Sequence, residues 1–232
     1  MMKFSTNAIL SFGLLFTLAF SSCKKDKETD KTAPESGTSF ISIVNASPGL
    51  ATYNFYMDDV KMNPAALPLG GSVPYVQVKS ATYASKFTSA GTTESLLSKS
   101  ITLNSNGTYT YFLTGRAGQL DGILSKDEIA GVITQGAIRF VNLSPDANAL
   151  DLVISGGTTV IANQFYKSIS AFVALAPAKY TLNVVDKSTG QVKTSIPNVE
   201  VAAGKYYTVL VRGMVSPSDT EYPLAAQLIV NM

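Results

Sequence analysis

The chain of 232 residues contains no histidine, no tryptophan and a single cysteine. Without histidine it lacks the most common general base, the Ser-His-Asp arrangement of serine hydrolases and the most frequent metal ligand. The lack of tryptophan gives little support to sugar binding by ring stacking. We therefore expect no catalytic residue, no metal site and no cofactor, so that the protein is not an enzyme.

An excess of charge of either sign is also missing. Eighteen lysines and arginines stand against 16 aspartates and glutamates, which gives a formal net charge of +2. Few of the basic residues are arginines, and no basic stripe is available for phosphate groups. This balance argues against nucleic acid as a partner.

Apolar runs long enough to cross a bilayer are missing after the amino terminus. The first apolar run, residues 8–20 (AILSFGLLFTLAF), follows a short basic start and has the length of a secretory h-region. It ends in Phe20-Ser21-Ser22-Cys23, which resembles a bacterial lipobox. We therefore expect residues 1–22 to be a lipoprotein signal peptide and Cys23 to be the lipidation site, so that an N-terminal lipid anchor holds the protein at a membrane. The alternative is an ordinary signal peptide cleaved nearby.

Residues 23–37 are almost devoid of apolar side chains, and their lysines are balanced by acidic residues. Such a segment cannot form a core, so we expect a disordered charged tether. It also resembles the surface-export signals of Bacteroidetes-type lipoproteins, which implies an outer-membrane location facing the cell exterior. The alternative is a plain solvated spacer.

The sequence repeats itself. Residues 44–57 (VNASPGLATYNFYM) and 141–154 (VNLSPDANALDLVI) share a Val-Asn-x-Ser-Pro motif at an offset of 97. The same offset pairs Ala81, Tyr83, Gly107, Tyr109 and Leu113 with Ala178, Tyr180, Gly204, Tyr206 and Leu210. This agreement indicates a tandem duplication, with one unit at 38–134 and the other at 135–232.

Within each unit, short runs with apolar residues at every second position alternate with turn residues. Tyr53, Phe55 and Met57 form one such buried face, and their counterparts Leu150, Leu152 and Ile154 form the other. About seven strands per unit are expected, with a turn of helix possible only at 96–97 and 125–129. The fold class is therefore all-β, with two tandem immunoglobulin-like or prealbumin-like β-sandwiches.

Two tyrosines, Tyr180 and Tyr206, open strands two places after a turn of small residues. We expect each to bury its ring while its hydroxyl reaches a neighbouring backbone group, which is a structural role.

A Ser-Pro pair ends the first strand of each unit, because proline cannot donate to a strand ladder. The stretch 139–146 (RFVNLSPD) followed by 149–153 (ALDLV) resembles the opening of domain-of-unknown-function family 4397. The resemblance implies a bacterial secreted or lipid-anchored protein, often with tandem copies, and brings no established activity. The family-motif residues are Arg139, Asn142, Ser144, Pro145, Asp146 and Asp151. A buried ion pair or turn brace is the expected role of Arg139 and Asp151.

Carboxylates are the remaining source of chemistry. Asp58 with Asp59, Asp127 with Glu128, and Asp146 with Asp151 could in principle form the pair of a glycoside hydrolase. Asp146, Asn148 and Asp151 could offer oxygen ligands to calcium. We expect solvated turn carboxylates in the first case and an Asx-type turn in the second.

Exposed aromatic rings are the remaining sign of binding. Tyr56 and Tyr111 are expected on the face opposite the core, where rings can anchor a protein or a sugar, unless they cover the interface between the units. The sequence thus favours a non-enzymatic cell-envelope lipoprotein that binds or scaffolds an envelope protein or a glycan. The alternatives are a structural spacer without a ligand and a carboxylate-dependent glycoside hydrolase.

Overall fold

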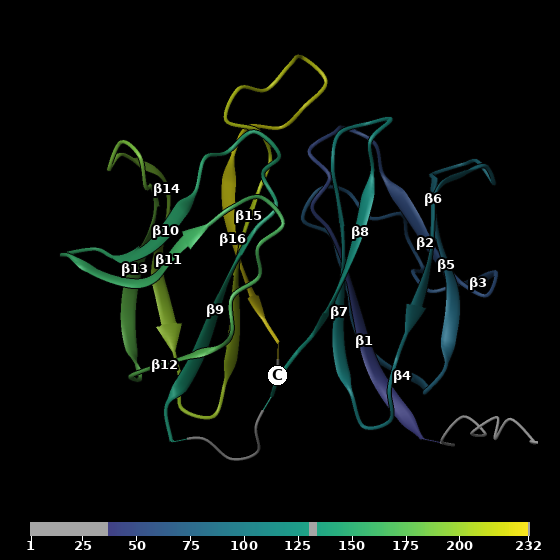
Figure 1. Ribbon diagram of the computed structural model, residues 1–232, viewed down its shortest axis with the longest axis horizontal. Coiled ribbons are helices and arrows are strands. Elements are labelled where there is room, and N and C mark those ends of the chain that lie inside the picture. The colour runs from purple at the N-terminus through teal and green to yellow at the C-terminus, as the bar shows by residue number, and fades with distance from the viewer. Residues whose placement is uncertain (1–36, 130–133, 232) are drawn as a thin grey trace, which may run out of the picture. The chain divides into compact units, whose positions relative to one another are not determined.

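The computed structural model describes residues 37–129 and 134–231, which contain strands and turns but no helix. Residues 1–36, with the predicted signal peptide, Cys23 and nearly all of the predicted tether, lie outside the described residues. Sixteen strands form four four-stranded sheets, two in each of two tandem β-sandwiches (Figure 1). Nothing helical in the described ranges has the length and apolar character needed to cross a membrane.

The first sandwich comprises sheets β4-β1-β7-β8 and β3-β2-β5-β6. Its strands are β1 (Thr38–Asn45), β2 (Tyr53–Met57), β3 (Val60–Lys61), β4 (Ser72–Lys79), β5 (Thr82–Ser89), β6 (Ser95–Thr102), β7 (Thr108–Thr114) and β8 (Asp121–Lys126). The expected all-β sandwich is confirmed. The possible helical turns at 96–97 and 125–129 are wrong, because 96–97 lies within β6, where Leu97 packs into the core, and 125–129 begins within β8 and forms no helix.

The second sandwich repeats this arrangement with sheets β12-β9-β15-β16 and β11-β10-β13-β14. Its strands are β9 (Gly136–Asn142), β10 (Leu150–Ile154), β11 (Thr158–Gln164), β12 (Val173–Leu175), β13 (Ala178–Asp186), β14 (Val192–Val201), β15 (Tyr206–Arg212) and β16 (Ala225–Val230). Neighbouring strands are antiparallel except β1 with β7 and β9 with β15, which are parallel. The duplicated sequence therefore folds into duplicated topology.

Each sandwich has its own apolar core, built from alternate residues of its two sheets. Tyr53, Phe55 and Met57 are buried in the first core, and Leu150 and Leu152 in the second, as the alternation predicts. In the first core, the rings of Phe55 and Phe87 lie 4.8 Å apart between centroids. These faces hold the two layers of each sandwich together.

The four central strands β1, β7, β9 and β15 are buried on both faces over most of their length. One face of each strand enters its own core, and the other contributes to a third apolar cluster shared by the two sandwiches. The fully buried members of the shared cluster are Val44, Ala46 and Phe112 from the first sandwich and Val141, Leu143 and Leu210 from the second. This explains why these strands read as nearly continuous apolar runs, as strands covered on both sides do.

The offset between equivalent residues of the two repeats changes along the chain. The offset of 97 holds for Ile41 and Ile138, but their parallel partners are Tyr109 and Tyr207, which are 98 residues apart. The Tyr109 hydroxyl accepts from the Asn104 N–H at 3.1 Å, and the Tyr207 hydroxyl does the same from Ala202 at 3.1 Å. The pairing of Tyr109 with Tyr206 is therefore wrong by one residue.

The other tyrosine prediction is confirmed. The Tyr180 hydroxyl donates to the carbonyl of Ala176 at 2.8 Å, and its counterpart Tyr83 donates to Lys79 at 2.6 Å. In β15, the Tyr207 hydroxyl makes a contact of this kind with the Ala202 N–H. These bonds brace the turn before each strand.

Candidate functional site

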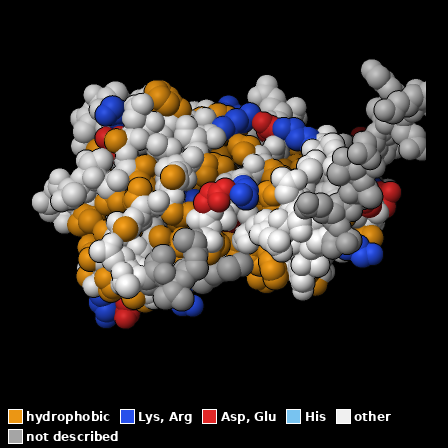
Figure 2. All heavy atoms as spheres, turned by 60° about the horizontal axis from the view of Figure 1, so that its bottom comes forward, with side chains coloured by type: hydrophobic (Ala, Val, Ile, Leu, Met, Phe, Trp, Pro, Cys, Tyr) orange, Lys and Arg blue, Asp and Glu red, His pale blue; other side chains and the backbone are white. Residues whose placement is uncertain are grey.

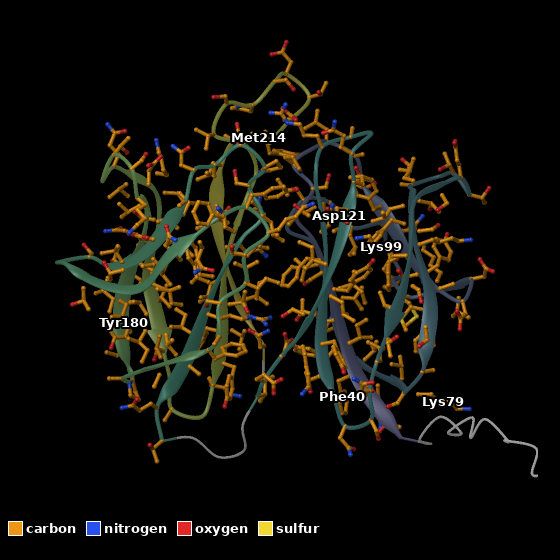
Figure 3. All side chains as sticks on the ribbon, in the orientation of Figure 1. Phe40, Lys79, Lys99, Asp121, Tyr180 and Met214 are labelled. Atoms are coloured by element: carbon orange, nitrogen blue, oxygen red, sulfur yellow. The ribbon has the colours of Figure 1, made fainter. Side chains whose placement is uncertain are left out.

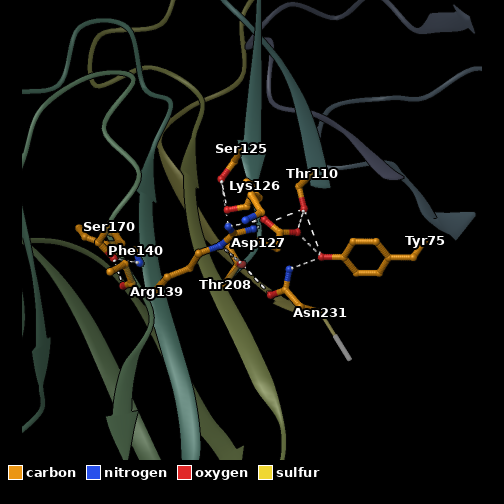
Figure 4. A network of polar contacts seen from close by, with 11 residues as sticks. Tyr75, Thr110, Ser125, Lys126, Asp127, Arg139, Phe140, Ser170, Thr208 and Asn231 are labelled. Atoms are coloured by element: carbon orange, nitrogen blue, oxygen red, sulfur yellow. Dashed lines mark hydrogen bonds and ion pairs between the residues drawn. The ribbon is translucent and has the colours of Figure 1, made fainter. Parts of the chain in front are cut away.

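A buried ion pair joins the two sandwiches (Figure 4). Arg139, in the middle of β9, is 1% exposed, and Asp127, directly after β8, is 3% exposed. The Arg139 Nη1 donates to Asp127 Oδ1 at 2.5 Å, and its Nε donates to Thr208 Oγ1 at 2.8 Å. The predicted buried ion pair of Arg139 is thus present, with a partner that the sequence did not indicate.

Three further side chains close a ring of hydrogen bonds around this pair. Asp127 Oδ2 accepts from the hydroxyls of Tyr75 at 2.5 Å and Thr110 at 2.6 Å. The Asn231 amide donates to the Tyr75 hydroxyl oxygen at 2.8 Å, and Asn231 Oδ1 accepts from Thr208 at 2.7 Å. Burial, together with the negative charge of Asp127, raises the pKa of Tyr75 to about 12, so this hydroxyl remains a donor.

The network is built from positions that the two repeats share. Ser42 and Arg139 occupy equivalent places beside Thr110 and Thr208 in the parallel pairs. Asp127 and Asn231 each follow the last strand of their sandwich, and each N–H bonds to the carbonyl that opens the neighbouring segment, at Thr108 and Tyr206. The first copy therefore supplies the acidic residue of the ion pair, Asp127, and the second copy supplies the basic residue, Arg139.

A cavity of about 160 Å³ lies beside the network. Its lining includes Arg139, Tyr75 and Asn231. Among the described residues, no buried side-chain nitrogen or oxygen lacks a hydrogen-bond partner. Because these polar groups satisfy one another across the joint, the arrangement holds the two sandwiches together.

The asparagine of the repeated motif braces the Ser-Pro turn. Asn142 Oδ1 accepts from the Ser144 N–H at 3.1 Å, and its amide donates to the Gln164 carbonyl at 3.1 Å. In the first copy, Asn45 makes the equivalent bonds to Ser47 and Leu67. An amide side chain that both donates and accepts is what this position requires.

The Ser-Pro turns also hold one long loop, residues 213–224 between β15 and β16. This loop is six residues longer than its counterpart, residues 115–120 between β7 and β8. Asp146, directly after Ser144-Pro145, accepts from the N–H groups of Val215 at 2.8 Å and Ser216 at 2.9 Å. In the first copy, the Pro48 carbonyl accepts from the Tyr222 N–H at 2.8 Å. Both copies of the motif therefore clamp the same loop.

Asp151 has a separate role. It accepts from the Asn163 N–H at 2.6 Å and lies 3.9 Å from Lys187 Nζ. Asn148 instead donates to Asp186 at 3.1 Å, so the three residues considered as calcium ligands contact different partners. In the part of the chain that the structure describes, no group of three histidine, cysteine or acidic residues could hold a metal ion.

The candidate carboxylate pairs are occupied in other ways. Asp58 and Asp59 lie in the tight turn between β2 and β3. Asp58 accepts from the Ala84 N–H at 2.8 Å, and Asp59 pairs with Lys86 at 2.6 Å. Asp127 is enclosed in the buried network, whereas Glu128 is exposed and pairs with Lys126 at 3.0 Å. In each of the three candidate pairs the two carboxylates have different partners, so none forms the pair of facing carboxylates that glycoside hydrolysis requires.

Tyr111 is wrong as a binding residue. It is 1% exposed, its ring lies 5.5 Å from that of Phe55, and Ser85 donates to its hydroxyl at 3.2 Å. The expected orientation is therefore reversed: Tyr111 points into the first core, and its neighbour Phe112 lies on the opposite face of β7, in the shared cluster. Tyr56 does point outward from β2, with the Lys86 ammonium 5.2 Å from its ring centroid.

Beside Tyr56, the outer face of β5 and β6 is hollowed. A shallow groove of about 390 Å³ is lined by Asp59, Thr82, Tyr83, Ala84, Ser85, Lys86, Ser98, Lys99 and Ser100. A second hollow of about 360 Å³ shares Thr82 with it and is lined by Ser80, Ala81, Thr82, Thr102, Leu103, Asn104 and Ser105. We call these two hollows together the hydroxyl groove. It is the outward-facing candidate binding site.

A charged bridge also connects the sandwiches at the surface. Asp121 of β8 accepts from Lys99 of β6, its neighbour in Figure 3, and from Lys167 of the second sandwich at 2.6 Å. Burial opposes ionisation, but the bonds from Lys167 and Lys99 outweigh it and lower the pKa of Asp121 to about 2. On the face drawn in Figure 2, basic side chains lie beside acidic ones and do not gather by sign.

Likenesses to solved structures are remote. The TIE protein of Bacillus anthracis is 12% identical, with a TM-score of 0.25. The alignment covers 76% of this chain and 34% of that protein, so this chain spans about a third of the length of the TIE protein. A carbohydrate-binding module of family 26 from Eubacterium rectale, solved with maltoheptaose, is 12% identical with a TM-score of 0.23, covering 83% and 95%. A putative cell adhesion protein from Bacteroides eggerthii is 8% identical with a TM-score of 0.25, covering 86% and 97%. Scores this low carry no argument about function.

No curated protein matches the sequence significantly. One family does match, over residues 39–153 and again over residues 136–227, and it is described as a domain of unknown function, DUF4397. The matches begin in β1 and in β9, the strands that open the two sandwiches; the first spans both copies of the Val-Asn-x-Ser-Pro motif, and the second spans the copy at 141–145. The chain therefore belongs to the DUF4397 family and carries two copies of its domain.

Proposed function

We propose that the protein is a non-enzymatic cell-envelope lipoprotein, anchored in the outer membrane through Cys23 and facing the cell exterior. Its paired sandwiches bind or scaffold a protein or a glycan. The observation that supports this most is the joint between the two domains, where Arg139 and Asp127 pair inside a closed polar network beside a shared apolar cluster. Two domains joined in this way act as one body that presents fixed surfaces.

The arrangement of the strands supports presentation away from a membrane. The chain enters β1 at Thr38, whereas the long loop 213–224 follows the carboxyl end of β15. The carboxyl ends of β7 and β9 lie together, because Thr114 Oγ1 donates to the Leu143 carbonyl at 3.3 Å. A tether from Cys23 would therefore join the sandwiches at the Thr38 end of β1, the end opposite these loops.

A structural spacer is the second candidate, and the rigid joint favours it as well. The two candidates differ in whether an outward surface has a ligand, and the hydroxyl groove favours binding. A glycoside hydrolase has no support from the carboxylates, since those predicted are engaged in turns or in the buried network.

The test is protease accessibility on intact cells that produce the protein, compared with a Cys23→Ala variant and followed by immunoblot of the folded domains. We expect protease to remove the signal from intact cells, and we expect the variant to be released in soluble form. Protection in intact cells, followed by digestion after the outer membrane is permeabilised, would contradict surface exposure and favour an envelope scaffold. Retention of the Cys23→Ala variant at the membrane would contradict the lipid anchor.

A further inference from the structure

The outer face of β5 and β6 carries hydroxyl groups in a regular row. Ser98, Ser100 and Thr102 alternate along β6 with Leu97, Lys99 and Ile101. Leu97 and Ile101 pack into the first core, and Lys99 reaches Asp121 in the facing sheet, so the three hydroxyl residues point outward and are exposed. On β5, Thr82 lies beside Thr102, with their hydroxyls 2.9 Å apart.

We propose that the hydroxyl groove binds an extended, uncharged polysaccharide. The inference rests on the proposed function and names the ligand class of its outward surface. Hydroxyl side chains donate and accept at once, which matches the hydroxyl groups of a neutral sugar chain and offers no fixed charge to an ionic ligand. β6 has eight residues and is about 26 Å long, enough to lie along several consecutive sugar units.

The second sandwich repeats this row only in part. Ser195 stands opposite Asn183 where Ser98 stands opposite Lys86, but Lys179 and Glu200 face each other where the first sandwich has Thr82 and Thr102. Strand pairing is thus satisfied by a charged pair in the second sandwich, so the fold does not require the hydroxyl pair at this end of the row.

Charges near the groove compensate each other. Lys86 pairs with Asp59 at 2.6 Å, and Lys99 is held by Asp121. Their opposite signs disfavour a strongly acidic or basic chain, since either would meet one like charge. The Asp59 carboxylate is largely exposed, so it can accept hydrogen bonds from sugar hydroxyls without leaving Lys86.

Tyr56 lies next to this charged pair and gives the groove an aromatic edge. Its ring is half-buried on the outer face of β2, directly across from Lys86 of β5. A phenol ring can pack against the apolar face of a sugar while its hydroxyl stays in water. The groove therefore depends on hydrogen bonds along its length and on one ring at its end, which needs no tryptophan.

The test uses the folded protein with soluble neutral polysaccharides, namely dextran, starch, laminarin, xylan and mannan, and with acidic alginate, in affinity gels and calorimetry. The groove variants are Ser98→Ala with Ser100→Ala, and separately Tyr56→Ala. The control is Asn183→Ala with Ser195→Ala, which removes two polar side chains from β13 and β14 of the second sandwich, at the register of Lys86 and Ser98. Thermal unfolding confirms that each variant remains folded.

We expect at least one neutral polysaccharide to bind, with affinity about tenfold weaker in each groove variant and unchanged in the control. The inference is overturned if none of the neutral polysaccharides binds, if only alginate binds, or if binding is equal in the groove variants and the parent. A protein that is surface-exposed by protease but binds no polysaccharide would refute this inference alone. A protein that binds polysaccharide but is protected in intact cells would refute the location alone.

Discussion

Arg139 shows how one side chain can carry a joint between domains. Its guanidinium lies 4.8 Å from the ring centroid of Phe172 and donates to Asp127, Thr208 and Ser125. A buried ion pair adds little over an apolar pair, but removal of one partner leaves an uncompensated charge in a poorly solvated place. The contribution of the pair to stability is therefore measured by removing one of its partners.

We predict that Arg139→Met lowers the free energy of unfolding by about 3–5 kcal/mol, because Asp127 would remain buried without a cation. Urea denaturation measures this change. The double variant Arg139→Met with Asp127→Asn should be less destabilised than Arg139→Met alone, since the orphaned charge is gone. Arg116→Met, which removes the exposed arginine of the ion pair with Glu221, is the control and should cost less than Arg139→Met. Equal losses for Arg116 and Arg139 would contradict the joint.

The low pKa of Asp121 predicts how the stability of the fold changes in acid. Its pKa is about 2 in the folded protein and 3.8 in its ordinary state, so the unfolded chain binds the proton first as the pH falls. Its contribution to stability is therefore complete above about pH 4 and is lost as the pH falls through about 2. We predict that Asp121→Asn loses less stability than the parent between about pH 5 and about pH 2 in urea titrations. Identical pH profiles would show that the bridge to Lys99 and Lys167 contributes nothing.

Individual strands were predictable because the alternation of buried and exposed residues can be read from a short stretch of sequence. The alternation at 53–57 and 150–154 placed the right residues in the two cores. Tyr111 was assigned to the wrong face: it points into the first core, whereas Phe112 points towards the second sandwich, so both faces of β7 carry buried aromatic rings. A period of two cannot reveal that both faces are covered.

The partner of Arg139 was unpredictable for a related reason. Asp127 is 12 residues away in sequence, but the two meet only because the sandwiches pack through β8 and β9. The available signal was the position of Arg139 within residues 136–142 (GAIRFVN), which form a fully buried strand. An arginine inside such a strand needs an acidic partner. The offset change from 97 to 98 was hidden because Tyr206 and Tyr207 are adjacent.

The loop 213–224 is an element held at both ends of its span by the repeated motif. We predict that Asp146→Ala makes the Val215 and Ser216 amides exchange hydrogen about tenfold faster, because both lose their carboxylate acceptor. Global stability should fall by less than about 2 kcal/mol, since the loop end is exposed. Asp219→Ala, a change in the same loop, is the control and should leave these amides unchanged. Slow exchange at Val215 in Asp146→Ala would contradict the clamp.

At the scale of the molecule, the shared apolar cluster implies that the two sandwiches depend on each other. Separation would expose Val44, Phe112, Val141 and Leu210, all of which are fully buried. We predict a single unfolding transition in scanning calorimetry, with a calorimetric enthalpy equal to the van't Hoff enthalpy. Val141→Asp, which places a charge inside the cluster, should split this transition into two. Two transitions in the parent protein would show that the domains fold independently.

The division of charge between the copies also fixes their order. Where the second copy has Arg139, the first has Ser42, and where the first has Asp127, the second has Asn231. A chain made of two first copies would bury a carboxylate against a serine, and a chain made of two second copies would bury a guanidinium against an asparagine. In either case a buried group would lose its partner and the joint would be weakened. The two copies are therefore no longer interchangeable, although their folds are the same.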